Sequence, residues 1–172
     1  MKYKLVAFWL VVFGALFAFL QTRFEYHFYY IEQSQLFLFT EAYIRNKLLL
    51  PGGFSMLVAE FLVQFFIRPY VGALVTAALL TGVGVCTAGI VKRIAPISGL
   101  FILYVLPMLA LLFMHFDFNY RVQGTVCYLM MMALLCGYMR IRNDLFRLVA
   151  GCVLVPVLFW LAGSIAVLRS EE

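Results

Sequence analysis

The sequence predicts an all-α protein: a polytopic membrane helix bundle with about five transmembrane helices and further helices at the membrane surface. Of its 172 residues, 66% are hydrophobic and 12% are charged, whereas soluble domains carry about 45–50% apolar and about 25% charged residues. A soluble fold of this size has too little interior to bury such an excess, so we expect lipid to cover much of the surface. The net charge of +5 then indicates cytoplasmic loops rich in Lys and Arg rather than a nucleic-acid partner.

The first predicted element is an apolar run at residues 5–21. It follows the basic start Met-Lys-Tyr-Lys and has no small-residue cleavage site after it, so it predicts an uncleaved signal anchor. A helix needs about 20 mostly apolar residues to cross the hydrocarbon, with a range of about 17–25. Four later runs have suitable lengths and predict the other spans: 70–91, 97–114, 122–139 and 148–168.

A sixth apolar run, 54–67, has only 14 residues, a length typical of interfacial or re-entrant helices. If it does not cross and the N-terminus is cytoplasmic, the basic loops at 92–93 and 140–147 face the cytoplasm, where seven Lys and Arg stand against one Asp. If it crosses, both loops face outward and only five Lys and Arg remain inside. The positive-inside rule favours the first arrangement. We therefore expect five spans in the cell inner (cytoplasmic) membrane.

Residues 22–69 then form one long segment on the outer face, between the first and second spans. The segment is too apolar for a solvated loop, and irregular backbone exposed to lipid is not tolerated, so we expect helices along the membrane surface. One helix is predicted over Tyr30–Leu50. Pro51-Gly52-Gly53 ends it, because proline lacks an N–H donor and glycine tolerates unusual dihedral angles.

The second surface helix, within 54–67, carries a polar stripe. Glu60, Gln64 and Arg68 recur every four residues, and Ser55 is placed to cap the start of the helix. The stripe has two interpretations. Either its side chains face water, or Glu60 and Arg68 point into a cavity between this helix and the spans.

The turn between the third and fourth predicted spans adds polar groups on the same side of the membrane. Charged groups so close to the bilayer are costly unless they are paired or hydrated. The turn therefore holds either a structural Asp117–Arg121 ion pair or part of a site shared with the outer segment. The candidate substrate-binding residues of such a site are Glu25, Glu60, Gln64, Arg68, His115 and Arg121.

The sequence predicts no metal site, and it leaves any cofactor unassigned. His27 and His115 have no second ligand at a suitable spacing. The cysteines lie inside apolar runs without CxxC spacing, where thiols behave as small hydrophobic groups: they are Cys86, Cys127, Cys136 and Cys152. The predicted spans hold no charged residue near their midplanes, which argues against an ion-coupled transporter.

Three segments carry a resemblance to a known family. "EQSQLFLFTEAYI", "LLLPGGFSMLVAEFLVQFFIRPYVGAL" and the later "VPVLFWLAGSIAVL" resemble a family of uncharacterised bacterial multi-pass membrane proteins, and the likeness covers essentially the whole chain. Members of that family are considerably longer. The resemblance therefore implies that this chain corresponds to their N-terminal portion. It indicates a membrane topology but no chemical mechanism.

The layout is also distantly similar to that of membrane glycosyltransferases of the C-type fold, which begin with one span followed by surface helices carrying an acidic residue. This likeness implies Glu32, or alternatively Glu25, as a catalytic acid, with Asp117 as a second one. The chain departs from the paired acids of that fold, because Gln33 follows Glu32.

Two functions are therefore expected. The first is a non-catalytic packing or assembly module, or the N-terminal membrane part of a larger protein. Its partners would be the lipid bilayer and either other proteins or the remainder of a longer chain. The second is the membrane portion of a transferase that acts on lipid-linked glycosyl substrates at the outer leaflet, with Glu32 and Asp117 as its acids.

Overall fold

The computed structural model describes residues 2–35, 37–94 and 101–163, and in these ranges the chain is entirely helical apart from its turns and connections. This confirms the predicted all-α class. The elements are α1 (Lys2–Arg23), α2 (Glu25–Ser34), α3 (Glu41–Leu49), α4 (Gly53–Val63), the 3₁₀ turn η1 (Gln64–Ile67), α5 (Val71–Ile94), α6 (Phe101–Met114), α7 (Val122–Tyr138) and α8 (Asp144–Ala162).

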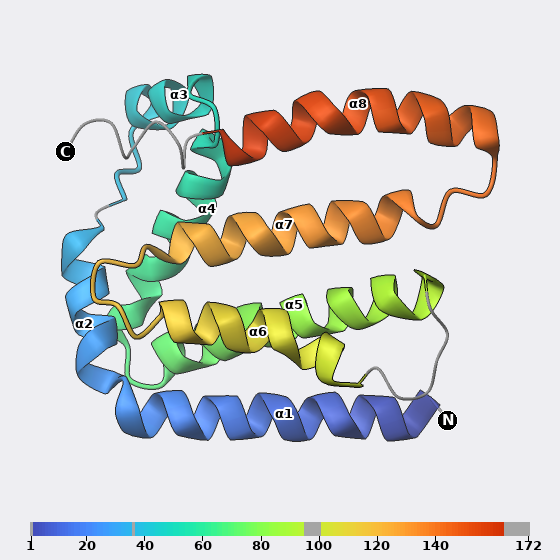
Figure 1. The fold of residues 1–172 in the computed structure, drawn as a ribbon. Helices are drawn as coiled ribbons and strands as arrows, with labels where there is room; N and C mark the ends of the chain where they lie inside the picture. The colour runs from blue at the N-terminus through green and yellow to red at the C-terminus, as the bar shows by residue number, and fades with distance from the viewer. Residues whose placement is uncertain (1, 36, 95–100, 164–172) are drawn as a thin grey trace.

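Figure 1 shows α1, α5, α6, α7 and α8 side by side, each running opposite to the one before it along the chain. Helix α2 lies across one end of this bundle, and α3 and α4 lie at the same end, which we call the α2–α4 end. The start of α1, the end of α5 and the α7–α8 connection lie at the opposite end, which we call the basic end. It carries Lys92, Arg93, Arg140, Arg142 and Arg147.

Helix α5 packs between α1, α6 and α7, and its small residues allow the close approach. A Cβ on Gly84 would lie 2.6 Å from the Trp9 ring, and one on Gly72 would lie 2.8 Å from the Phe28 ring. Ala73 and Ala77 are buried in the core beside them. Gly72 and Gly84 therefore leave room for bulky aromatic side chains from α1 and α2.

Three helical segments within the described ranges are long and apolar enough to cross a membrane: Leu5–Arg23, Val71–Ile94 and Asp144–Leu161. Helices α6 and α7 coincide with the predicted spans 97–114 and 122–139, but they are shorter, with 14 and 17 residues. Residues 97–100 and 164–168 of the predicted spans lie outside the described residues. The prediction of five crossings stays a prediction.

The single helix predicted over Tyr30–Leu50 is wrong. Helix α2 ends at Ser34, and α3 starts only at Glu41, after Thr40 in an extended conformation. Phe37, between the two helices, contacts residues of α4 and η1. Its ring packs edge-on against Phe61, with 5.9 Å between the ring centroids. Its carbonyl accepts a hydrogen bond from the Gln64 side chain at 3.2 Å. Tertiary contacts therefore override the continuous helical pattern.

The Pro51-Gly52-Gly53 turn does more than end a helix. Gly52 adopts a left-handed conformation (φ 79°), and its N–H donates to the carbonyl of Trp160, near the end of α8. The Ser55 hydroxyl lies 2.8 Å from the Gly52 carbonyl and 3.1 Å from the Leu161 carbonyl. The prediction that Ser55 caps α4 is wrong, because Gly52 occupies that position and no side chain caps the helix. The turn instead satisfies carbonyls that the last turn of α8 leaves open.

We predict that alanine at Gly52 or Gly53 destabilises the protein. A Cβ on Gly53 would lie 1.6 Å from the Lys47 carbonyl oxygen, and Gly52 has a positive φ, so each change costs about 1 kcal/mol or more. Gly137→Ala is the matched control, because its Cβ would meet nothing within 4 Å and alanine favours a helix. Thermal unfolding in detergent measures the three variants; a Gly53→Ala protein as stable as Gly137→Ala would contradict the role of the turn.

Candidate functional site

A cavity of about 210 Å³ opens at the α2–α4 end of the bundle. We call it the α3–α4–α7 pocket, after the helices that supply most of its wall. Its lining residues come from the end of α2, from α3 and α4, and from the start of α7: Gln35, Tyr43, Lys47, Met56, Ala59, Glu60, Arg121 and Gln123. Polar and charged side chains dominate this list, in a chain that is mostly apolar.

Glu60 is the buried carboxylate of the pocket, with 6% of its surface exposed. Lys47 Nζ lies 2.9 Å from Oε1, and the Tyr43 hydroxyl donates to Oε2 at 2.5 Å. Tyr43 and Lys47 are four residues apart, so they share one face of α3. A buried carboxylate requires such partners, because its charge is costly to remove from water.

The partners of Glu60 are themselves held in place. Lys47 Nζ lies 3.1 Å from Met56 Sδ and 5.3 Å from the centroid of the Tyr43 ring. Burial and the hydrogen bond to Glu60 both raise the pKa of Tyr43. The phenol therefore stays protonated and keeps donating to the carboxylate across the physiological pH range. Glu60, with both oxygens engaged, is an orienting group rather than a free acid or base.

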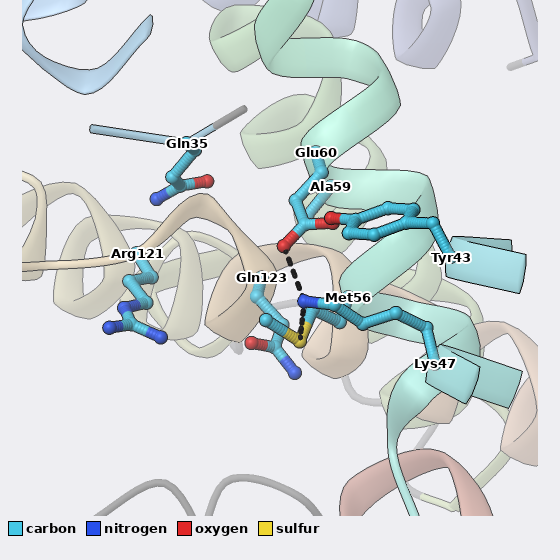
Figure 2. A pocket seen from close by; sticks show the side chains of 8 residues that line it. All are labelled: Gln35, Tyr43, Lys47, Met56, Ala59, Glu60, Arg121 and Gln123. Carbon is cyan, nitrogen blue, oxygen red and sulfur yellow. Dashed lines mark hydrogen bonds and ion pairs between the residues drawn. The ribbon is translucent and has the colours of Figure 1, made fainter. Parts of the chain in front are cut away.

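Arg121 lies across the pocket from Lys47 (Figure 2). It is exposed, and its guanidinium forms no ion pair with any residue in the described ranges. The predicted Asp117–Arg121 ion pair is therefore not formed. Asp117 Oδ1 instead accepts the backbone N–H of Asn119 at 2.9 Å, which is a local turn contact.

Of the predicted substrate-binding residues, the structure brings Glu60 and Arg121 together in one pocket. The stripe of Glu60, Gln64 and Arg68 is broken, because the α-helix ends at Val63 and continues as the 3₁₀ turn η1. Gln64 bonds the Phe37 backbone. Arg68 is exposed beyond η1 and lines a hollow of only about 10 Å³ together with Glu25. The cavity interpretation thus applies to Glu60 and not to Arg68.

The two candidate catalytic acids take no part in this pocket. Glu32 is partly exposed on α2, and Asp117 is exposed in the α6–α7 turn; neither lines the cavity. The residues that sequence reasoning missed are Tyr43, Lys47, Gln35 and Gln123. One signal in the sequence could have indicated Lys47: Glu60 is an acid in an otherwise apolar segment, and a buried acid needs a nearby cation.

His115 belongs to a separate polar cluster beside the pocket. It is 2% exposed, its Nε2 lies 3.0 Å from Thr125 Oγ1, and the Tyr120 hydroxyl lies 3.1 Å from the same Thr125 atom. Burial lowers the pKa of His115 to about 4, with a smaller contribution from nearby His27. The imidazole is therefore neutral at physiological pH and joins the α6–α7 turn to α7.

Within the described ranges, no group of three or more His, Cys, Asp or Glu side chains could hold a metal ion. The four cysteines are free thiols. Cys127, at the start of α7, is buried and lies 3.5 Å from the Leu161 carbonyl. The side chains that line the α3–α4–α7 pocket offer hydrogen bonds and charges to a ligand.

The sequence profile of a family of unknown function, DUF6057, matches residues 1–170. The chain belongs to this family. The resemblance to an uncharacterised family is therefore confirmed, and membership assigns no reaction. No curated protein and no solved structure matches the chain, so its activity must be inferred from the pocket.

We predict that Lys47→Met destabilises the protein, because it leaves the Glu60 carboxylate buried without its cation. The free energy of unfolding should fall by about 2–3 kcal/mol, less than for a fully buried pair, since the Lys47 side chain is 19% exposed. The double variant Lys47→Met/Glu60→Gln removes both charges and should recover most of this loss. Unfolding in detergent measures both; equal stability of wild type and Lys47→Met would show that the pair contributes nothing.

The His115 cluster predicts a pH dependence of stability. Between pH 6.5 and about 4, the unfolded chain binds a proton at His115 that the folded chain does not bind. Stability therefore falls as the pH is lowered through this window, by at most about 3 kcal/mol. His115→Gln should reduce the fall in melting temperature between pH 7.5 and pH 5. The pKa of His27 is also lowered by burial, so His27→Gln is measured in parallel; a His115→Gln protein with the full wild-type fall would contradict the assignment.

Proposed function

We propose that the chain is a multi-pass inner-membrane protein whose α3–α4–α7 pocket binds the polar part of a membrane amphiphile at the outer boundary of the bilayer. The observation that carries the proposal is the buried Glu60, held by Lys47 and Tyr43 in the wall of an open cavity. A protein that only packs against neighbours has no need of an open cavity lined by an ion pair in this position.

The arrangement of the helices supports the proposed orientation. The predicted cytoplasmic loops at 92–93 and 140–147 lie at the basic end together with the start of α1 (Figure 1). The helices α3 and α4, which supply most of the pocket lining, lie at the opposite end. Helices α2 and α4 carry aromatic and polar side chains at that end, as suits helices in the headgroup region. We infer five crossings, with the N-terminus in the cytoplasm.

Binding is favoured over catalysis by the state of the carboxylates. Both Glu60 oxygens accept hydrogen bonds, and neither Glu32 nor Asp117 lines the cavity. A transferase that used Glu32 and Asp117 would need these acids at a common substrate. We therefore expect that Glu32→Gln and Asp117→Asn leave ligand binding in the pocket unchanged.

The location is tested with single cysteines in a chain whose four native cysteines are replaced by alanine. We predict that Gln35→Cys, in the pocket, and Asn46→Cys, on the exposed side of α3, react with a membrane-impermeant maleimide in intact cells. Asp144→Cys, at the basic end, should react only after the cells are permeabilised. The reverse pattern would place the pocket in the cytoplasm and end the proposal.

The same substitutions test binding. In purified Gln35→Cys protein, bilayer lipid should slow the modification of the introduced thiol relative to detergent alone, because the headgroup occupies the pocket. The thiol introduced by Asn46→Cys lies outside the cavity and serves as the control for general shielding. Equal slowing at positions 35 and 46 would show that lipid covers the surface without entering the pocket.

A further inference from the structure

The charges around the α3–α4–α7 pocket do not balance. Glu60 and Lys47 neutralise each other at 2.9 Å. Arg121 is the remaining charged residue of the lining, and its guanidinium forms no ion pair with a side chain in the described part of the protein. The pocket therefore carries one positive charge in excess, and a ligand that supplies one negative charge would complete it.

The start of α7 adds to this positive character. Arg121 is the N-cap residue of α7, and no side chain caps the helix; an arginine side chain also has no acceptor with which to do so. The first N–H groups of a helix carry partial positive charge and bind phosphate and carboxylate groups. Arg121, which precedes α7, and Gln123, which lies in its first turn, both line the pocket. The guanidinium and the helix end therefore favour the same sign of ligand charge.

The size and surroundings of the pocket indicate which part of a ligand enters. Its volume of about 210 Å³ is below the roughly 300–1,000 Å³ of sites that enclose whole drug-sized ligands. Helix α3, which forms one wall, has no buried residue and exposes Leu48, Leu49 and, just beyond it, Leu50. A small charged headgroup fits inside, and an apolar chain attached to it would find apolar side chains outside.

We propose that the ligand is an amphiphile whose phosphate headgroup carries a net negative charge, unlike the zwitterionic headgroup of phosphatidylcholine, and that its phosphate is seated on the Arg121 guanidinium and the first turn of α7. This inference rests on the proposed function and deepens it. Gln123 also lines the cavity, and a side-chain amide in this position suits the neutral hydroxyl or ester oxygens of a headgroup. Lys47 stays bound to Glu60 and positions that side of the wall.

The experiment uses the full-length single-cysteine protein with Gln35→Cys. The rate of modification of its thiol is measured in nanodiscs of phosphatidylcholine alone, in nanodiscs that also contain phosphatidic acid, and in detergent with inorganic phosphate. We expect phosphatidic acid to protect the thiol at position 35 at a low mole fraction. Arg121→Gln should weaken this protection about tenfold or more, as the loss of one charge-assisted contact does. Arg68→Gln, an exposed arginine at the same end but outside the pocket, is the matched control and should retain the protection.

Each outcome has a separate meaning. Protection by phosphatidylcholine alone, unchanged by Arg121→Gln, would overturn the phosphate assignment and leave the proposed function standing. Protection by inorganic phosphate at the same phosphate concentration would show a site for a small anion and overturn the amphiphile. Equal weakening by Arg121→Gln and Arg68→Gln would show attraction to a charged surface only. Absence of protection in every medium would overturn both the inference and the proposed function. Arg121 is exposed, so its substitution should not unfold the chain, and the melting temperature checks this.

Discussion

The burial of one carboxylate organises the end of the bundle at which the pocket lies. Glu60 stands on α4, whose neighbouring side chains are apolar, and a lone carboxylate cannot remain charged in such a place. Tyr43 and Lys47 supply a donor to each of its oxygens, but they can do so only if α3 folds back over α4. The reversal needs the left-handed turn at Gly52 and the close backbone approach at Gly53. The ion pair thus depends on the turn, and Tyr43, Lys47 and Glu60 together form part of the cavity wall.

The long helices could be predicted from the sequence because each is determined by its own continuous apolar run. Continuous apolar runs form α1, α5, α6, α7 and α8, and each lies where the sequence predicts a run of suitable length. The break between the end of α2 at Ser34 and the start of α3 at Glu41 could not be predicted in the same way. Its sequence continues a helical pattern, and it is interrupted by contacts of Phe37 with Phe61 and Gln64, which lie more than twenty residues further along the chain.

The candidate site could be predicted only in part, for the same reason. Glu60 is recognisable because it is an acid among apolar residues, and Arg121 because it borders a long apolar run. Tyr43 and Lys47 are not, because their role depends on how α3 packs on α4. Glu32 and Asp117 are predicted as catalytic acids from the similar layout of C-type-fold glycosyltransferases. Neither of them lines the pocket. A predicted membrane topology indicates on which side of the membrane a residue lies. Whether that residue lines a pocket also depends on how the short helices are oriented relative to one another.

The contact between the Gly52 turn and α8 has a consequence for the order of biosynthesis. The acceptors of the Gly52 N–H and the Ser55 hydroxyl are the carbonyls of Trp160 and Leu161, and Leu161 is 106 residues further along the chain than Ser55. When α4 leaves the ribosome, these carbonyls have not yet been synthesised. The turn must therefore wait until the last of the described helices has been synthesised and packs against it. An early segment of the chain is in this way one of the latest to reach its final structure.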